Sequence, residues 1–152
     1  MSSQSDTETI EPPSDPDFEV LASVIAQLYF FQSEFEYKGD VIAQIVHPLN
    51  NGPYDYLLVV WQNGNRKLVH RIASSMNQRW AKRTGSLTWN YESEAGTQSS
   101  WCIALLESDQ YEPFKGLFTQ VMWESLHQES WNKVKVCIVY TCQNMIAHVP
   151  IV

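Results

Sequence analysis

The hydrophobic residues of this chain recur with two spacings, one typical of β-strands and the other of an α-helix. From residue 18 to residue 105, runs of apolar and aromatic residues largely alternate with polar ones, as in half-buried strands. From residue 109 the spacing changes to three and four, which predicts an amphipathic helix over residues 109–131. Its inner face is predicted to hold Tyr111, Phe114, Phe118, Val121, Met122 and Leu126. We therefore expect short strands that are closed at one end by a helix.

Turn residues separate the strands along the chain. Strands are predicted over the aromatic second half of residues 20–32 and over residues 41–46, 56–62, 66–72, 86–91 and 101–105. Asn63-Gly64 tolerates positive φ and suits a type I′ hairpin turn, whereas residues 74–83 fit either a short helical turn or an irregular strand. Six or seven antiparallel strands followed by one helix predict a mostly β (α+β) pleckstrin-homology-like fold. In this fold a bent antiparallel sheet is capped by a C-terminal amphipathic helix.

Two starts remain open for the predicted helix. Asp109 with Glu112 three residues later matches a capping box, whereas Pro113 favours Glu112 as the N-cap and itself as the first helical residue. The outer face is expected to carry the polar residues Lys115, Gln120, Glu124 and Gln128.

The net charge of −7 is concentrated at the start of the chain. Six acidic residues, from Asp6 to Glu19, precede the first Lys or Arg, and seven acidic and seven basic residues then balance between Val20 and Glu107. Because residues 1–17 contain one strong hydrophobe, Ile10, they are predicted to be a disordered acidic tail or linker. The remainder is nearly neutral, so no nucleic-acid partner is expected.

The absence of targeting patterns and the cysteine usage both indicate an intracellular, cytoplasmic protein. No stretch approaches the roughly 20 consecutive apolar residues of a membrane span, and the acidic N-terminus lacks the pattern of a signal peptide. The three cysteines are odd in number and unevenly placed, which argues against a disulfide framework. Cys102 is expected to be a small core residue of a strand.

Several stretches, taken in order, also resemble a known family. They are Ser86-Leu-Thr-Trp-Asn-Tyr91, Ser100-Trp-Cys-Ile-Ala-Leu105, Tyr111-Glu-Pro-Phe-Lys115, residues 118–126 and residues 131–135, preceded by residues 28–31 and 41–46. This combination resembles the pleckstrin-homology-like domain of the fungal vacuolar import and degradation protein 27 family over residues 18–135. The resemblance implies a domain with this fold and a connection with vacuolar import and degradation.

Residues 136–152 depart from the family pattern and contain no charged residue. They show no helical period, no steady alternation and no turn signals, so we predict a non-family tail in a truncated or mis-spliced reading of a longer protein. The alternative is a genuine short isoform in which residues 136–141 add an edge strand.

Motifs for catalysis are missing from the sequence. It contains no Gly-x-Ser-x-Gly, no Gly-rich phosphate loop, no His-Glu-x-x-His and no Cys-x-x-Cys. Glu124 and His127 form a lone Glu-x-x-His, half of a di-iron pattern, and are interpreted as two solvated helix residues. Cys137, Cys142 and His148 match no common zinc-finger spacing, so their grouping is interpreted as accidental. We predict no enzyme, no cofactor and no metal.

A basic run offers the first candidate binding site. Its members, with no acidic residue among them, are Arg66, Lys67, Arg71, Arg79, Lys82 and Arg83. Such a concentration is a candidate site for a phosphoinositide or another anionic lipid, each charge contributing about 1 kcal/mol near a membrane. The hairpin predicted around residues 31–41 holds only Lys38 beside three acidic residues. This favours instead a solvated basic face that meets the acidic tail.

Tryptophan content offers the second candidate site. Trp89 and Trp101 are interpreted as core residues of strands. Trp123 falls off the apolar helix face, and an exposed Trp beside a groove is typical of peptide-binding surfaces. The candidate partner-binding residues are therefore Trp80, Trp123 and Trp131, although packing at the core or its edge is the favoured interpretation of all three.

Three functions remain open at this point. The favoured one is a non-catalytic protein-interaction or scaffold domain that docks a peptide or a neighbouring domain. The alternative is an anionic-membrane adaptor that uses residues 66–83, and the third is a structural spacer in a larger trafficking protein. The expected partner is a protein or peptide, with an anionic lipid as the alternative, and the chain is expected to be monomeric.

Overall fold

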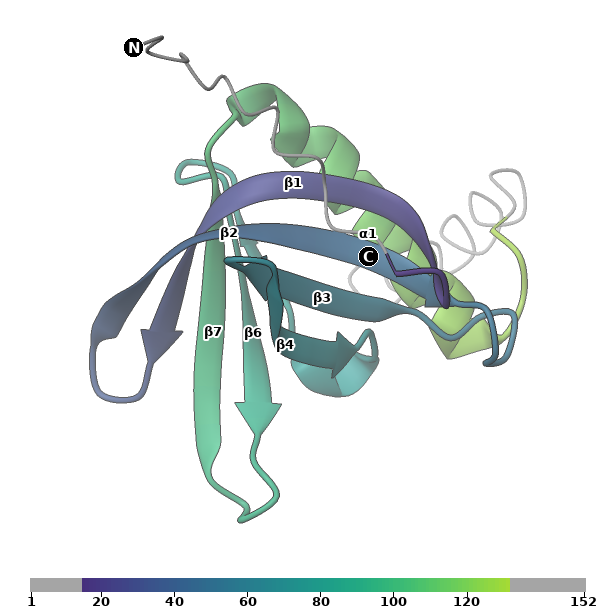
Figure 1. Ribbon diagram of the computed structural model, residues 1–152, viewed down its shortest axis with the longest axis horizontal. Helices are drawn as coiled ribbons and strands as arrows, with labels where there is room; N and C mark the ends of the chain where they lie inside the picture. Colours follow the sequence, from purple (N-terminus) through teal and green to yellow (C-terminus); the bar gives the residue numbers. More distant parts are fainter. Residues whose placement is uncertain (1–14, 132–152) are drawn as a thin grey trace, which may run out of the picture.

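Seven strands form one antiparallel sheet in the computed structural model, which describes residues 15–131 (Figure 1). They are β1 (Phe18–Phe31), β2 (Phe35–Pro48), β3 (Leu57–Gln62), β4 (Asn65–Arg71), β5 (Arg79–Ala81), β6 (Ser86–Glu92) and β7 (Gln98–Leu105). The order β4-β3-β2-β1-β7-β6-β5 makes β4 and β5 the edges of the sheet. Helix α1 (Tyr111–His127) follows β7, and the short 3-10 turns are η1 (Ser74–Met76) and η2 (Ser108–Gln110). The predicted bent sheet with one C-terminal helix is confirmed.

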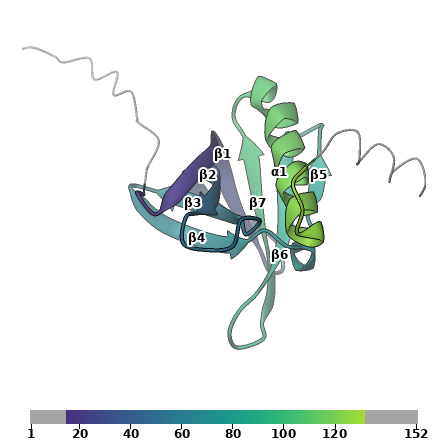
Figure 2. The ribbon, with the colours of Figure 1, turned by 90° about the vertical axis from the view of Figure 1, so that its right-hand side faces the viewer.

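The sheet bends along its two longest strands. β1 pairs with β2 over most of its length, but with β7 only from Ala26 to Phe31. The β1–β2 register shifts between Val20 and Ala22 and again after Leu28, and such bulges increase the local twist. The β1–β4 half and the β5–β7 half therefore diverge, and α1 runs along the second half (Figure 2).

One of these bulges depends on a glycine. Gly39 pairs with Leu28 and has a φ of +112°, which L side chains rarely adopt. A Cβ at this position would lie 2.5 Å from Nε2 of Gln62, which donates a hydrogen bond to the carbonyl oxygen of Lys38. The β1–β2 hairpin therefore bends at a residue that has no side chain.

The turns agree with the sequence predictions. Asn63 and Gly64 connect β3 to β4 with φ values of 52° and 78°, as a type I′ turn requires. For residues 74–83 the sequence allowed either a short helical turn or an irregular strand, and the structure has both. η1 is a short helical turn, and β5 is a three-residue strand. Asn77, with a φ of 47°, separates the two.

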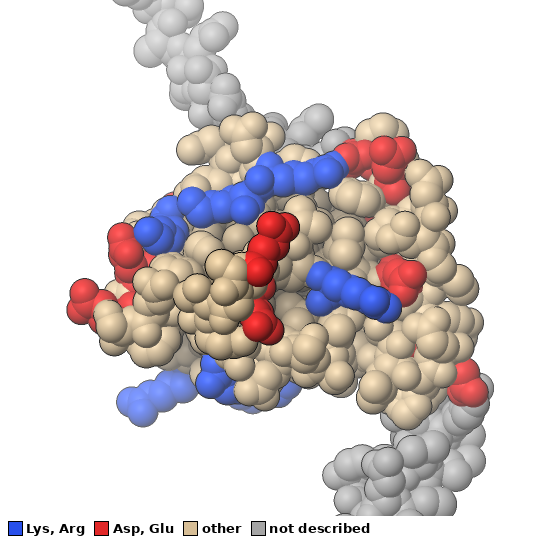
Figure 3. All heavy atoms as spheres, turned by 90° about the horizontal axis from the view of Figure 1, so that it is seen from below, with Lys and Arg blue, Asp and Glu red and all other residues tan. Residues whose placement is uncertain are grey.

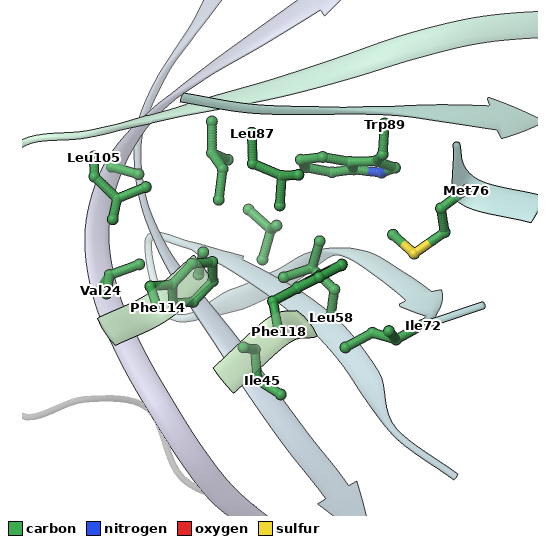
Figure 4. Packing of buried hydrophobic residues seen from close by; sticks show 14 of the residues in the cluster. Val24, Ile45, Leu58, Ile72, Met76, Leu87, Trp89, Leu105, Phe114 and Phe118 are labelled. Carbon is green, nitrogen blue, oxygen red and sulfur yellow. The ribbon is translucent and has the colours of Figure 1, made fainter. Parts of the chain in front are cut away.

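The core lies between the inner face of the bent sheet and α1 (Figure 4). Phe118 lies beside Leu58 and Ile45 and Phe114 lies beside Val24, with Trp89 on the other side of the core (Figure 4). Each of these side chains is almost completely buried, and burial of one such side chain stabilises the fold by about 1.5–3 kcal/mol. The aromatic helix face predicted from the spacing thus packs on the sheet.

The two ends of the helix differ from the sequence predictions. Neither predicted cap forms, because η2 leads directly into α1, with Gln110 at the N-cap and no side-chain cap hydrogen bond. At the other end Leu126, predicted to be buried, is 63% exposed, whereas Glu124, predicted to face outward, is 8% exposed. The hydroxyl of Tyr56 and the backbone N–H of Trp131 donate hydrogen bonds to the Glu124 carboxylate, which accounts for its burial.

The strand aromatics are buried to different degrees. Leu28 is fully buried, but Tyr29, Phe30 and Phe31 are only half-buried, so the prediction of a buried strand fails at the end of β1. The reason is that the β1–β2 hairpin extends past the core. Trp89 is buried as predicted, and Trp101 is a half-buried residue at the edge of the core that packs against Phe30 at 4.6 Å between ring centroids.

Three sequence predictions lie partly or wholly outside the described residues. They concern the tail before Asp15, the non-family tail of residues 136–152, and the grouping of Cys137, Cys142 and His148. Cys102 is a buried strand residue, as expected. Within residues 15–131 the structure contains no helix with the length and apolar character needed to span a membrane.

Candidate interaction surface

Trp80, the first of the predicted partner-binding residues, packs between β5 and α1. Its ring meets those of Tyr111, Phe114 and Phe118 edge-on, with centroids 5.8, 6.2 and 5.5 Å apart. Edge-to-face contacts of this kind stabilise beyond simple burial. The half-buried indole therefore attaches the short edge strand to the helix.

Trp123 and Trp131 form a separate aromatic group at the end of α1. Their ring centroids lie 5.8 Å apart with the planes at 88°, and Trp123 also lies 4.4 Å from the ring of His127. Both indoles are half-buried. The structure thus brings Trp123 and Trp131 together, whereas Trp80 contacts the first half of the helix.

A buried carboxylate positions this group. The hydroxyl of Tyr56 donates to Oε2 of Glu124 at 2.5 Å, and the backbone N–H of Trp131 donates to Oε1 at 2.7 Å. Burial, together with the bond to Glu124, raises the pKa of Tyr56 well above its ordinary value. Because Tyr56 lies 68 residues away in the chain, the helical spacing gave no sign of this partner.

The interpretation of Glu124 and His127 as two solvated residues is therefore wrong for Glu124. Its carboxylate joins Tyr56, which directly precedes β3, to the helix and to the segment that follows the helix. His127 instead packs against Trp123. No three His, Cys, Asp or Glu side chains among the described residues are grouped so as to hold a metal ion.

The six basic candidates are spread over both edges of the sheet. Arg66, Lys67 and Arg71 lie on β4, Arg79 lies on β5, and Lys82 and Arg83 lie in the loop after β5. In the view from below, a row of Lys and Arg side chains ends beside Asp and Glu side chains (Figure 3). The surface is therefore mixed in charge.

Three of these cations face acidic residues. Arg71 pairs with Asp55 at 3.3 Å, and Lys82 pairs with Glu112 at 3.6 Å. Arg66 contacts Asp15, the first described residue, and its guanidinium also lies over the rings of Phe18 and Trp61 at 4.7 and 5.3 Å. Within residues 15–131, the cations without an acidic partner in the basic run are Lys67, Arg79 and Arg83.

A groove on the outer face of the sheet was missed by the sequence analysis. It has a volume of about 360 Å³ and lies between the β1–β2 hairpin and β5, β6 and β7. Phe31 and Phe35 provide its aromatic wall, with ring centroids 4.9 Å apart, and Arg79 lines the β5 side. The sequence contained both phenylalanines, but only the strand register pairs Phe31 with Phe35 across the hairpin.

The same hairpin face exposes large aromatic side chains. Phe35 is 59% exposed and Tyr37 is 51% exposed. Tyr37 packs against Tyr29 at 5.5 Å between centroids and donates a hydrogen bond to Asp40 at 2.6 Å. Clustered exposed aromatics are typical of surfaces that bind a partner.

A second hollow, of about 410 Å³, opens between β4 and the ends of β6 and β7. His70 on β4 lies at its base, where its Nδ1 accepts a hydrogen bond from Nε1 of Trp89 at 2.6 Å. The imidazole also stacks on Tyr91 at 4.4 Å, and burial lowers the pKa of His70 to about 4. A neutral His70 thus connects the edge strand β4 to the opposite half of the sheet.

Comparison with known proteins identifies the family of this fold. A model of the VID27 PH-like domain matches residues 19–125. The chain belongs to this family. Vacuolar import and degradation protein 27 of Schizosaccharomyces pombe is 24% identical to the chain over 119 residues. That alignment covers 76% of this chain but 15% of the relative, so the chain corresponds to a small part of that protein.

Solved structures with the same fold have low sequence identity. Two crystal structures of the Ran-binding domain of the nuclear pore component Nup2 from Ashbya gossypii each superpose with a TM-score of 0.58. They are 14% and 15% identical, and the matches cover 69% and 68% of this chain and 95% of each of those chains. The VID27 PH-like domain therefore shares its architecture with the Nup2 domains.

Proposed function

We propose that this VID27 PH-like domain is a non-catalytic protein-interaction module that docks a segment of another protein. The observation that carries the proposal is the exposed aromatic face of the β1–β2 hairpin beside the outer groove. Phe35 and Tyr37 expose large apolar surfaces to water, and a bound partner would cover these surfaces. The domain would act in the cytoplasm, as a monomer and without a cofactor.

The relatives support this proposal at the level of class. Domains of this fold are typically interaction modules, and the Nup2 domains bind a protein according to their name. The relative from Schizosaccharomyces pombe connects the family with vacuolar import and degradation. We therefore propose that the partner of this domain belongs to that process.

The buried carboxylate and the buried imidazole of the described residues, Glu124 and His70, support a non-catalytic role. Glu124 is engaged by Tyr56 and Trp131, and His70 is engaged by Trp89. Both side chains connect elements of the fold. None of these three hydrogen bonds involves a serine, threonine or cysteine side chain that could act as a nucleophile. The near-neutral folded part also gives no reason to expect a nucleic-acid partner.

Site-specific photo-crosslinking in cells tests the proposal. A photoreactive residue is placed in the full chain at Tyr37 on the hairpin, at Trp123 on α1, or at Lys67 on β4 as the control. We expect Tyr37 to capture a discrete protein that Lys67 does not capture, identified by mass spectrometry. Capture from Trp123 alone would move the site to the end of α1. No discrete product from either position would contradict a protein-interaction role.

A second candidate function is the anionic-membrane adaptor. Lys67, Arg79 and Arg83 support it, because none of them faces an acidic residue within residues 15–131. The ion pairs of Arg66, Arg71 and Lys82 weaken it, since these contacts offset half of the basic run. Co-sedimentation with phosphoinositide vesicles at low salt is the test, and failure to pellet there would exclude this function.

A further inference from the structure

We propose that the groove beside the β1–β2 hairpin binds an extended protein segment in which an acidic residue neighbours an aromatic or aliphatic one. The carboxylate would bind Arg79, and the apolar side chain would cover Phe31 and Phe35. This inference rests on the proposed function and specifies its site and the chemistry of its partner.

Arg79 supplies the positive charge at the groove. Its Nη2 donates to Oδ1 of Asn90 at 3.1 Å, and the same oxygen accepts a hydrogen bond from the hydroxyl of Ser100 at 3.2 Å. Asn90 is therefore held by β7 and in turn orients Arg79 along the groove. No acidic residue within residues 15–131 pairs with this guanidinium. Its planar set of donors matches a carboxylate, which accepts two parallel hydrogen bonds.

The aromatic wall supplies the apolar contact. Phe31 and Phe35 line the groove together with Ala81, and Phe35 keeps more than half of its surface in water. An apolar side chain placed over the two rings would remove this surface from water at about 25 cal/mol per Å². The wall lies across the groove from Arg79, so one short segment can contact both.

The groove is also elongated and lined by neutral polar groups. A smaller hollow of about 190 Å³ shares Phe31, Asn90 and Ser100 with it and continues toward the β6–β7 loop. The additional polar groups of this continuation are Gln32, Gln98 and Ser99. Amide and hydroxyl side chains both donate and accept hydrogen bonds, as the backbone of an extended segment requires.

Charge complementarity gives the segment a direction. Arg79 lines the β5 side of the groove, and neither Arg79 nor Arg83, which follows β5 in the chain, pairs with an acidic residue within residues 15–131, so this side is basic. On the hairpin side Glu34 and Glu36 flank Phe35 in the chain, and Glu36 pairs with Lys38 at 3.1 Å, so this side offers no unpaired cation for a carboxylate among the described residues. A segment with its acidic residue toward β5 and its apolar residue toward the hairpin satisfies both sides, whereas a lysine in place of the acid would face Arg79.

Selection from a peptide library tests the proposal with the full chain. Twelve-residue peptides contain Glu or Asp beside Phe or Leu, and a matched set carries Lys in place of the acid. We expect the acidic set to be enriched, and we expect the best peptide to shift the backbone amide signals of Asn90 and Ser100 in NMR spectra. Arg79→Gln should weaken its binding about tenfold or more, as loss of a charge-assisted contact does.

Lys67→Gln is the matched control for Arg79→Gln. Lys67 is likewise an exposed cation without an acidic partner in the described part of the chain, but it lies on β4, the other edge of the sheet. Its replacement should leave peptide affinity unchanged, while Phe35→Ala should weaken it several-fold. Cooperative urea unfolding of every variant, with a midpoint close to that of the wild type, would show that the fold is intact.

The possible outcomes separate this inference from the proposed function. Equal enrichment of the lysine set, no enrichment at all, or equal effects of Arg79→Gln and Lys67→Gln would overturn the groove as the site. A partner captured through Trp123 whose affinity is unchanged by Arg79→Gln would leave the interaction module intact and overturn this inference. Arg79-dependent binding to anionic vesicles instead of peptides, or Arg79-dependent dimerisation in sedimentation, would overturn it as well.

Discussion

Aromatic side chains gather at two places in this domain, under the helix and on the β1–β2 hairpin. Under the helix, Phe114 and Phe118 are 2% and 0% exposed and Trp80 packs edge-on against both. On the hairpin, the rings of Phe31 and Phe35 pack against each other just as closely, but Phe35 is largely exposed. Close ring contacts therefore occur in both places, and only the covering layer differs.

The difference arises from the length of the elements. β1 and β2 are each 14 residues long, and the hairpin that joins them projects past the core and away from α1 (Figure 1). Aromatics under the helix contribute to stability because they leave water on folding. Aromatics on the hairpin remain in water and are free to contribute to binding. The following experiments test this division.

Truncation of a ring under the helix should have the largest effect. Phe118→Ala removes a fully buried ring and should lower the free energy of unfolding by about 3–5 kcal/mol. Urea denaturation followed by tryptophan fluorescence measures the loss. Because a small domain has a total stability of roughly 5–15 kcal/mol, Phe118→Leu provides a milder variant with a smaller loss in the same direction. A loss below about 1 kcal/mol for Phe118→Ala would contradict the interior role of the helix face.

Acid should destabilise the fold through His70, which connects β4 to the buried Trp89. Burial lowers the pKa of His70 from 6.5 to about 4, so between these values the unfolded chain binds more protons than the folded one. Stability should therefore be unaffected by His70 above about pH 7, and should fall from about pH 6.5 to pH 4 by up to about 3 kcal/mol. Protonation of Nδ1 would also break the bond from Trp89.

His70→Gln is the control for this pH dependence. Glutamine keeps an acceptor for Trp89 but does not titrate, so the variant should lose most of the decline over this interval. Urea denaturation at several pH values compares the two proteins. Arg71 and Glu92 also line the hollow beside His70, and the variant leaves both in place. An identical slope in wild type and variant would assign the acid sensitivity to other groups.

Removal of the hydroxyl that binds the buried carboxylate should have an intermediate effect. Tyr56→Phe deletes a hydrogen bond to Glu124 in the interior and should cost about 1.5–3 kcal/mol in thermal or urea unfolding. Tyr54→Phe is the matched control, because the hydroxyl of Tyr54 contacts Ser130 at the exposed surface. Its loss should stay within about 0.5 kcal/mol. Equal losses for the two variants would show that Glu124 does not anchor the helix.

The smallest change in stability is expected on the hairpin. Phe35→Ala should alter the free energy of unfolding by no more than about 0.5–1 kcal/mol, since most of the ring already lies in water. The same variant should weaken partner binding, so stability and affinity are measured on one sample. A loss as large as that of Phe118→Ala would mean that the hairpin aromatics belong to the fold and would remove the contrast between the two regions.

Much of the fold was predictable because it depends on local patterns. The Asn63-Gly64 turn, the alternation in β6 and β7, and the aromatic face of α1 each follow from a short stretch of sequence. The errors occur where distant residues decide. Glu124 was expected to face outward because the helical spacing cannot reveal Tyr56, and Leu126 was expected to be buried because the spacing does not indicate where the sheet ends.

The candidate sites were harder to predict than the elements. The basic run looks continuous along the chain, but β4 and β5 place its members at opposite edges of the sheet, and Asp15, Asp55 and Glu112 approach three of them. Likewise, Trp80 and Trp123 share a residue type but not a surface, since one packs against the first half of α1 and the other against its last turn. Adjacency in sequence is a weak guide to adjacency on a folded sheet.

The sequence by itself determined the approximate positions of most strands and of the helix, and the family that the chain resembles, whereas β2 extends to Phe35–Pro48 beyond the predicted residues 41–46. These properties depend on periodicity, turn chemistry and the order of motifs, all of which are local or linear. The tertiary structure decided which aromatics are covered, which cations are paired and where a groove forms. The physical reason is that the bend of the sheet brings Phe31, Phe35 and Arg79 around one hollow from three separate strands. Only the register of those strands, and not their composition, sets that arrangement.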